Sequence, residues 1–112
     1  MIISKITAPH YQWGNNCDAW TLFQSDKAIV KEEEMPPNSE ESLHIHENTE
    51  QFFYILEGEA EFIVGHELFV LRAGNAIAIK SGNPHKIANR SSQKLHFLVC
   101  SFPGNLSDRI EL

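Results

Sequence analysis

The segment from Ser42 to Gly58 reads SLHIHENTEQFFYILEG, and it carries the strongest fold signal in the chain. Its second half is rich in aromatic and β-branched residues, which is typical of a strand. His44 and His46 are separated by one residue, so both imidazoles project from the same face if this segment is extended. Two imidazoles side by side are the arrangement that a metal ion needs from its first two ligands.

Short strand-like runs, separated by turn residues, continue on both sides of this segment. No window of a dozen residues shows helical periodicity with start and stop signals. Many short strands in one small chain predict an all-β protein, folded as a sandwich or a jelly-roll barrel. We expect residues 1–18 to form a looser arm, packed on the barrel or on a second subunit, and Ser107–Leu112 to be a peripheral tail. The predicted strands are Ala19–Gln24, Ala28–Glu33, Ser42–His46, Gln51–Glu57, Ala60–Val64, Leu68–Leu71, Ala76–Ile79, His85–Ala88 and Leu95–Ser101.

Size and charge exclude several classes of function. The 112 residues fit one domain, 1–112, with a formal net charge of −6 and nine scattered basic residues. That balance argues against nucleic acid or an anionic membrane as a partner. Two distant cysteines, Cys17 and Cys100, predict reduced thiols in a cytoplasmic protein. No apolar run is long enough for a secretory signal or a membrane span.

Two motifs lie in register along the chain. Residues 38–58 hold Asn38, five intervening residues, His44-Ile45-His46, four intervening residues, Gln51, six intervening residues and Gly58. Residues 74–89 hold Gly74, Lys80-Ser81-Gly82, His85 and Asn89. These spacings resemble the two motifs of the cupins, and the chain resembles the small single-domain bacterial members. The resemblance implies a double-stranded β-helix, or jelly-roll barrel, and a metal site formed by His44, His46, Gln51 and His85.

The chain departs from the cupin pattern at three positions. Asn38 stands in place of a glycine and Lys80 in place of a proline, and neither change removes a ligand. Gln51 occupies the position at which the family usually has a glutamate ligand. Its neighbour Glu50 is the alternative ligand, but adjacent residues of a regular strand face opposite sides, and the six-residue spacing to Gly58 favours Gln51. Gln51 could also be a buried amide that only makes hydrogen bonds in the core.

The resemblance implies a divalent transition metal, which could be zinc, nickel, iron, manganese, cobalt or copper, because imidazole ligands do not discriminate among them. It also implies a small-molecule ligand. We predict an anionic ligand, because a neutral Gln51 leaves the charge of the metal uncompensated. The function expected is that of a metal-dependent enzyme, such as a dioxygenase, isomerase or lyase, acting on a small organic anion or sugar derivative. The alternatives are a non-catalytic binding protein for a sugar or metabolite, and a structural dimer stabilised by its metal.

The acid–base group of such an enzyme is not determined by the sequence. Glu50, Tyr54 and His96 are the candidates, although His96 is more simply a surface or packed histidine. Cys17 lies in a segment with two tryptophans that could cover the barrel mouth or contact a second subunit. The run Glu32-Glu33-Glu34 is interpreted as a solvated strand end. Apolar residues on the outer side of the Gln51 strand, together with open strand edges, predict a homodimer.

Overall fold

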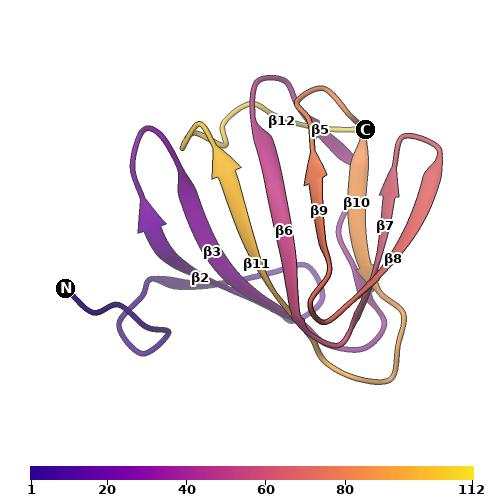
Figure 1. Cartoon of the computed structure of the whole chain (residues 1–112), viewed down its shortest axis with the longest axis horizontal. Coiled ribbons are helices and arrows are strands. Elements are labelled where there is room, and N and C mark those ends of the chain that lie inside the picture. The colour runs from indigo at the N-terminus through magenta and orange to yellow at the C-terminus, as the bar shows by residue number, and fades with distance from the viewer.

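The computed structural model describes all 112 residues and contains twelve strands and no helix. The strands form two antiparallel sheets, in the orders β1-β2-β3-β11-β6-β9 and β12-β5-β10-β7-β8, with β4 paired to β10. Figure 1 shows them curving around a common interior. This is the all-β barrel that the sequence predicts. The strands are β1 His10–Trp13, β2 Cys17–Gln24, β3 Ile29–Met35, β4 Ser39–Glu40, β5 His44–His46, β6 Glu50–Glu57, β7 Glu59–Val64, β8 Glu67–Arg72, β9 Ala76–Ile79, β10 His85–Asn89, β11 Leu95–Phe102 and β12 Arg109–Glu111.

All nine predicted strands are present, with their ends moved by at most two residues. The alternation of exposed and buried residues explains why these strands could be predicted from the sequence. In β6 the residues alternate between exposed and buried from Glu50 to Leu56, so that Gln51, Phe53 and Ile55 face inward. The inner sides of the strands meet in a core whose fully buried members include Phe62, Phe97 and Met35.

Both chain ends differ from the prediction. Within the expected loose arm, β1 pairs with β2, and β2 already begins at Cys17. Cys17 is fully buried in the core cluster, so its role in this structure is packing. The tail expected to be peripheral contains β12, which pairs with β5 along its length, Arg109 opposite His46 and Glu111 opposite His44. β1 has four residues and pairs with its neighbour β2, and β12 has three residues and pairs with the distant β5, so their own sequences carry little strand signal.

Two of the motif positions are explained by backbone geometry. Gly58 has φ +90°, and a Cβ atom there would lie 2.4 Å from the carbonyl oxygen of Lys94, so only glycine fits. Asn38 has φ 60°, the left-handed conformation that asparagine tolerates better than most residues. The replacement of glycine by Asn38 therefore preserves the turn that leads into β4 and β5.

Candidate metal centre

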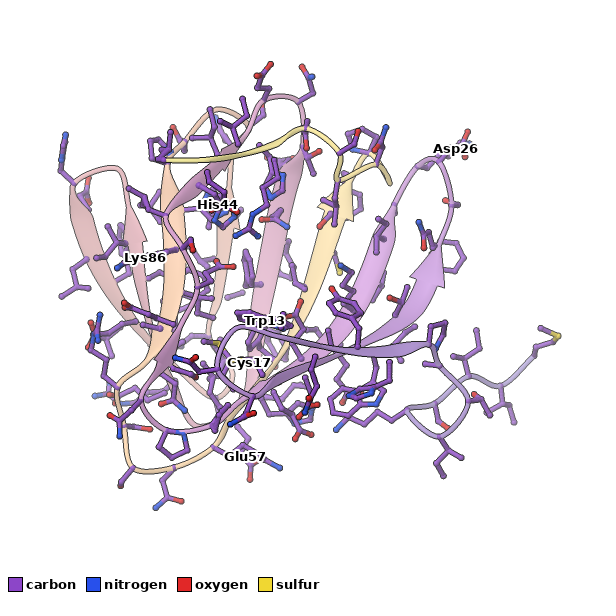
Figure 2. The ribbon with its side chains drawn as sticks, turned by 180° about the vertical axis from the view of Figure 1, so that it is seen from behind. Trp13, Cys17, Asp26, His44, Glu57 and Lys86 are labelled. Atoms are coloured by element: carbon purple, nitrogen blue, oxygen red, sulfur yellow. The ribbon has the colours of Figure 1, made fainter.

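Three buried histidines meet near one end of the barrel interior, where β5 and β10 pair. His44 lies directly opposite His85 in the register of these strands, and His46 follows on the same side of β5. The three residues are 1–3% exposed, and one ligand atom from each lies within 4.8 Å of the others. Figure 2 shows His44 inside the upper end of the barrel, away from Cys17 and Glu57. The structure thus brings together the three histidines that the motifs predict.

Hydrogen bonds fix which nitrogen of each ring is available. The Nδ1 atoms of His44 and His85 lie 2.8 Å from the backbone oxygens of Ser42 and Asn83. A carbonyl oxygen only accepts, so both Nδ1 atoms carry the proton and both Nε2 atoms keep a lone pair. Burial lowers the pKa of His44 to about 4 and also lowers that of His85, so both rings are neutral at pH 7.

His46 is oriented by a carboxylate that the sequence did not reveal. Its Nδ1 lies 3.0 Å from Oδ1 of Asp108, and Oδ2 of Asp108 accepts hydrogen bonds from the Asn48 backbone N–H and the Thr49 hydroxyl. Burial alone would raise the pKa of Asp108, but these hydrogen bonds outweigh it and lower the pKa. Asp108 therefore stays ionised and holds His46 with its Nε2 free. A carboxylate behind a histidine is a common second layer of metal sites.

Gln51 faces the interior beside His85, whereas Glu50 is exposed on the other side of β6. The Gln51 amide donates to the Ser101 hydroxyl at 3.0 Å, and its Oε1 lies 3.1 Å from Nε2 of His85. Because His85 Nε2 has a lone pair, two acceptors face each other in this arrangement. A cation bound by both atoms removes the conflict, and in its absence a 180° rotation of the amide would do so. Gln51 therefore shares the inner side of the barrel with the histidines, and Glu50 does not.

The donor set fits a divalent transition metal. Three unprotonated imidazole nitrogens converge, and the Gln51 amide oxygen lies beside one of them. Metal–nitrogen bonds of roughly 2.1 Å separate two ligands by at most roughly 4.2 Å, so small ring rotations would suffice. Neutral imidazoles and an amide suit several transition metals, and the ligands do not choose among them.

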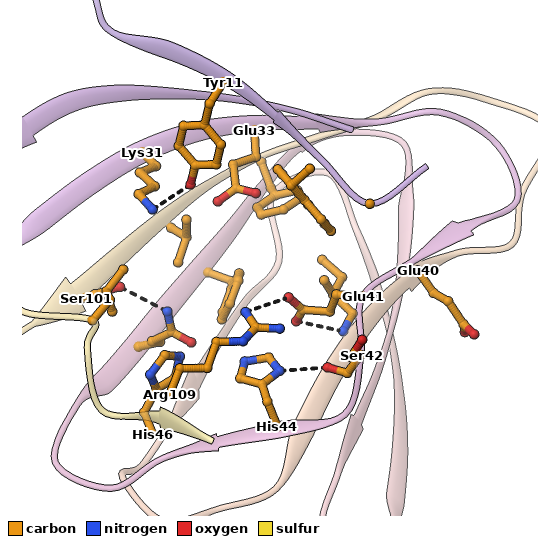
Figure 3. Close-up of a pocket in the computed structure, with 18 residues that line it drawn as sticks. Tyr11, Lys31, Glu33, Glu40, Glu41, Ser42, His44, His46, Ser101 and Arg109 are labelled. Atoms are coloured by element: carbon orange, nitrogen blue, oxygen red, sulfur yellow. Dashed lines mark hydrogen bonds and ion pairs between the residues drawn. The ribbon is translucent and has the colours of Figure 1, made fainter. Parts of the chain in front are cut away.

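A cavity of about 440 Å³ lies beside His44 and His46, and its lining includes side chains of both charges. Figure 3 shows Arg109 reaching into it from β12, next to His44 and His46. One guanidinium nitrogen of Arg109 lies 3.8 Å from Oε2 of Glu41, and its Nε donates to Glu111 at 2.7 Å. No sequence pattern indicated Arg109, because the pairing of β12 with β5 places it there.

The three residues considered as acid–base candidates do not face this cavity. Glu50 and Tyr54 are exposed on the outer side of β6, and Tyr54 is 38% exposed. His96 lies on the outer side of β11, with Nε2 2.6 Å from Oε1 of Glu32. Strand alternation is the reason in each case, since their inward neighbours are Gln51, Phe53 and Phe97.

Two other carboxyls do line the cavity. Glu33 was interpreted as part of a solvated strand end, but it shares a face of β3 with the buried Ile29 and Met35 and borders the cavity. Burial raises the pKa of Glu33 to about 7 against the opposing charge of Lys31. Burial likewise raises the pKa of Glu41 to about 8, against the charge of Arg109. Period-two alternation from Ile29 would have indicated that Glu33 faces inward.

Comparison with known proteins agrees with this architecture. The cupin-domain family model matches residues 31–101. An uncharacterized protein of Methanocaldococcus jannaschii is 34% identical over 82 residues, 73% of this chain and 66% of that protein. The oxalate-binding protein of Thermotoga maritima is 35% identical over 65 residues, 58% of this chain and 54% of that protein. The chain thus matches less than two thirds of the length of either relative.

Among solved structures, the crystal structure of a predicted oxalate decarboxylase from Thermotoga maritima superposes with a TM-score of 0.85. The superposition covers 92% of this chain and 99% of that one at 24% identity, a level that supports the fold alone. The structure has no helix that could span a membrane. With the family model matching more than half of its residues, the chain belongs to the cupin-domain family.

Proposed function

We propose that this protein binds a divalent transition metal through Nε2 of His44, His46 and His85, with Gln51 as a fourth ligand. The proposal rests on one observation: three buried imidazoles keep their Nδ1 protons in hydrogen bonds and aim their lone pairs at a shared volume. Without a cation these lone pairs repel one another in a buried site. A metal ion would relieve this repulsion and satisfy all three nitrogens.

The ligand that we propose for this site is a small organic anion, including anionic sugar derivatives. A bound metal would act as a Lewis acid on an oxygen of the ligand. The protein contributes no carboxylate to the metal if Gln51 is the fourth ligand, so the anion supplies the missing negative charge. Arg109 is placed to orient the anion, because its guanidinium reaches the cavity next to the histidines. The relative named as an oxalate-binding protein supports this ligand class.

The function that we favour is enzymatic, with proton transfer by the chain's own groups. Glu33 and Glu41 are the carboxyls with a pKa near neutrality in the cavity, which is the property of a group that accepts and returns protons at pH 7. They replace the candidates that face outward. Non-catalytic capture of the anion is the second candidate, and the relative described as a binding protein favours it. A metal that only stabilises a dimer is the third, and the open cavity disfavours it.

Metal binding is tested with two variants of neighbouring residues. Gln51→Glu places a carboxylate on the ligand side, and we expect it to bind Co²⁺ or Zn²⁺ at least tenfold more tightly than the native protein, because a charge–charge attraction is added. Glu50→Gln is the matched control, because it changes the exposed neighbour. Isothermal titration of metal into metal-free protein gives the affinities. Equal affinities for the native protein and Gln51→Glu would remove Gln51 from the ligand set.

Catalysis and capture separate in a second experiment on the metal-loaded protein. Cobalt absorption spectra report whether acetate, azide or oxalate reaches the metal, and a panel of small carboxylates and sugar phosphates is then tested for turnover. A change of spectrum with turnover supports the enzyme. A change without turnover on any of them supports capture, and no change together with a large fall in melting temperature on metal removal supports the structural role.

We also propose that the protein is a cytoplasmic homodimer. Its two cysteines are free, as expected of a reducing compartment. On the outer side of β6, Phe52, Tyr54 and Leu56 are 38–41% exposed and form an apolar row that a second copy would cover. Light scattering of the native protein and of a Phe52→Glu variant tests this: the native mass should be twice that of one chain, and the variant should dissociate.

A further inference from the structure

One wall of the cavity carries charged groups that the metal centre does not use. Lys31 and Glu33 face inward from β3, at positions where alternation would normally place apolar residues such as Ile29 and Met35. Tyr11 and Trp13 of β1 complete this wall. Figure 3 shows Lys31, Tyr11 and Glu33 on one side of the cavity, with His44, His46 and Arg109 on the other. Inward-facing charges are costly in a barrel and indicate a ligand-binding role.

Some hydrogen-bond donors of this wall are not fully paired with acceptors of the protein. Lys31 Nζ donates to the Tyr11 hydroxyl at 2.7 Å, a neutral partner, and its charge acts on Glu33 of the same strand without forming an ion pair with it. The buried Nε1–H of Trp13 has no partner that meets hydrogen-bond geometry. It lies close enough to the Glu33 carboxyl to lower the pKa of that group. An unpaired buried donor is uncommon in proteins and calls for an acceptor. An anionic oxygen in the cavity would serve both the Trp13 and the Lys31 donors.

The Lys31 side and the Gln51 side of the cavity are separated by a distance that a short organic chain can span. Lys31 of β3 pairs with Val99 of β11, and Val99 pairs with Phe53 of β6, next to Gln51 on the inner face. β3 and β6 are thus separated by two strand spacings, which is roughly 10 Å between their backbones. Lys31 and Gln51 both line the cavity between these strands. The cavity, at about 440 Å³, is of the size that holds ligands much larger than a two-carbon acid.

We propose that Lys31, Trp13 and Glu33 form a second subsite that binds the far carboxylate of a dicarboxylic acid of more than two carbons, whose near carboxylate lies at the histidines. This inference rests on the proposed function, because the near end requires the metal. Arg109 is held by Glu41 and Glu111, so Lys31 is the cation available to the far carboxylate. The two carboxylates and the length of the carbon chain between them together define the ligand class.

Glu33 adds a dependence on pH to this subsite. When protonated it donates a hydrogen bond to the far carboxylate, and when ionised it repels it. Burial raises its pKa to about 7, and Lys31 on the same strand, the Trp13 N–H and Arg109 of β12 oppose this rise. The other titratable groups that line this space are Tyr11, Glu40, Glu41, His44 and His46. Binding of the far carboxylate therefore weakens as the pH rises above 7.

The experiment compares glutarate with pentanoate, which has the same chain length and lacks the far carboxylate. Titration calorimetry with metal-loaded native protein should show glutarate binding at least tenfold more tightly, the gain expected from a charge-assisted hydrogen bond. Lys31→Met keeps the aliphatic part of the side chain. It should lower the ratio of glutarate affinity to pentanoate affinity to near one, and it should leave the pentanoate affinity unchanged. Lys27→Met is the control, because Lys27 is exposed in the turn that joins β2 and β3. In the native protein, the ratio of glutarate affinity to pentanoate affinity should fall as the pH rises from 6 to 8.5. In Glu33→Gln this ratio should stay constant over the same range.

The outcomes for the subsite and for the metal centre are separate. A glutarate to pentanoate ratio near one, or a ratio that survives in Lys31→Met, overturns the second subsite whatever happens at the metal. Pentanoate affinity that is unchanged when the metal is removed with a chelator overturns the proposed metal function. If glutarate still binds metal-free protein through Lys31, the second subsite stands and only the metal function fails.

Discussion

The two ends of the barrel interior are built from the same strands and have opposite chemistry. Along β6 the inward residues change from polar Gln51, which faces the histidines, to Ile55, which is fully buried in the apolar core. Along β10 they change in the same way from His85 to Ile87. The apolar end is packed around the fully buried Phe62, whose ring centroid lies 5.0 Å from that of Phe53 at the floor of the cavity. The polar end holds a cavity and buried groups with shifted pKa values. Packing at one end thus stabilises a barrel whose other end is arranged for binding, at a cost in stability.

The largest effect of a single substitution should come from the apolar end. Phe62→Ala removes a fully buried ring and leaves a cavity, so we expect the free energy of unfolding to fall by about 3–5 kcal/mol. His44→Ala at the polar end should cost the metal-free protein less than about 2 kcal/mol, because the ring borders a cavity. Urea unfolding of both variants measures the difference. Equal losses would mean that the two ends contribute alike to stability.

The next effect concerns the residue behind His46. Asp108→Asn keeps the size of the side chain and removes the charge that orients the His46 ring, so metal affinity should fall about 10–100-fold. Asp26→Asn, in the exposed turn between β2 and β3 labelled in Figure 2, is the control and should bind metal like the native protein. Metal titrations at pH 7.5 compare the three proteins. An unchanged affinity in Asp108→Asn would show that the carboxylate is not needed to hold the ring.

A smaller effect is expected in the pH dependence of stability. The folded protein holds the proton of Glu41 more tightly than the unfolded chain does, so this contribution is complete below pH 4.5 and is lost as the pH rises to about 8. His44 acts in the opposite direction, but only below pH 6.5, since burial lowers its pKa to about 4. Between pH 6.5 and 8 the Glu41 contribution to the free energy of unfolding should therefore fall by about 1–2 kcal/mol.

Glu41→Gln removes the titration of this group and should flatten the decline. Urea unfolding of metal-free native protein and of Glu41→Gln at pH 6.5, 7.2 and 8 provides the comparison. Glu40→Gln is the neighbouring control, because Glu40 forms ion pairs with Lys86 and Arg90 toward the outside. A decline that is equally steep in Glu41→Gln would place the responsible proton on another group, of which Glu33 is the first to examine.

Local patterns account for what the sequence could predict. The alternation in β6 and the spacing of His44, His46 and His85 are properties of short segments, and the structure agrees with them. The same reasoning applied to β3 would have found Glu33, where the acidic run was instead interpreted as solvated. Local patterns could not have revealed Asp108 and Arg109, because only the pairing of β12 with β5 brings them to the site. A three-residue strand has no periodicity from which a distant partner can be inferred.

The central claim is that the Nε2 atoms of His44, His46 and His85 bind one metal ion in the cavity. A crystal structure of the metal-loaded protein, with anomalous diffraction recorded at the absorption edge of the metal, tests it directly. We predict one peak at roughly 2.0–2.2 Å from all three Nε2 atoms, with Gln51 Oε1 facing it. A peak only at exposed histidines such as His66, or a site left empty by protein that carries one equivalent of metal, would contradict the claim.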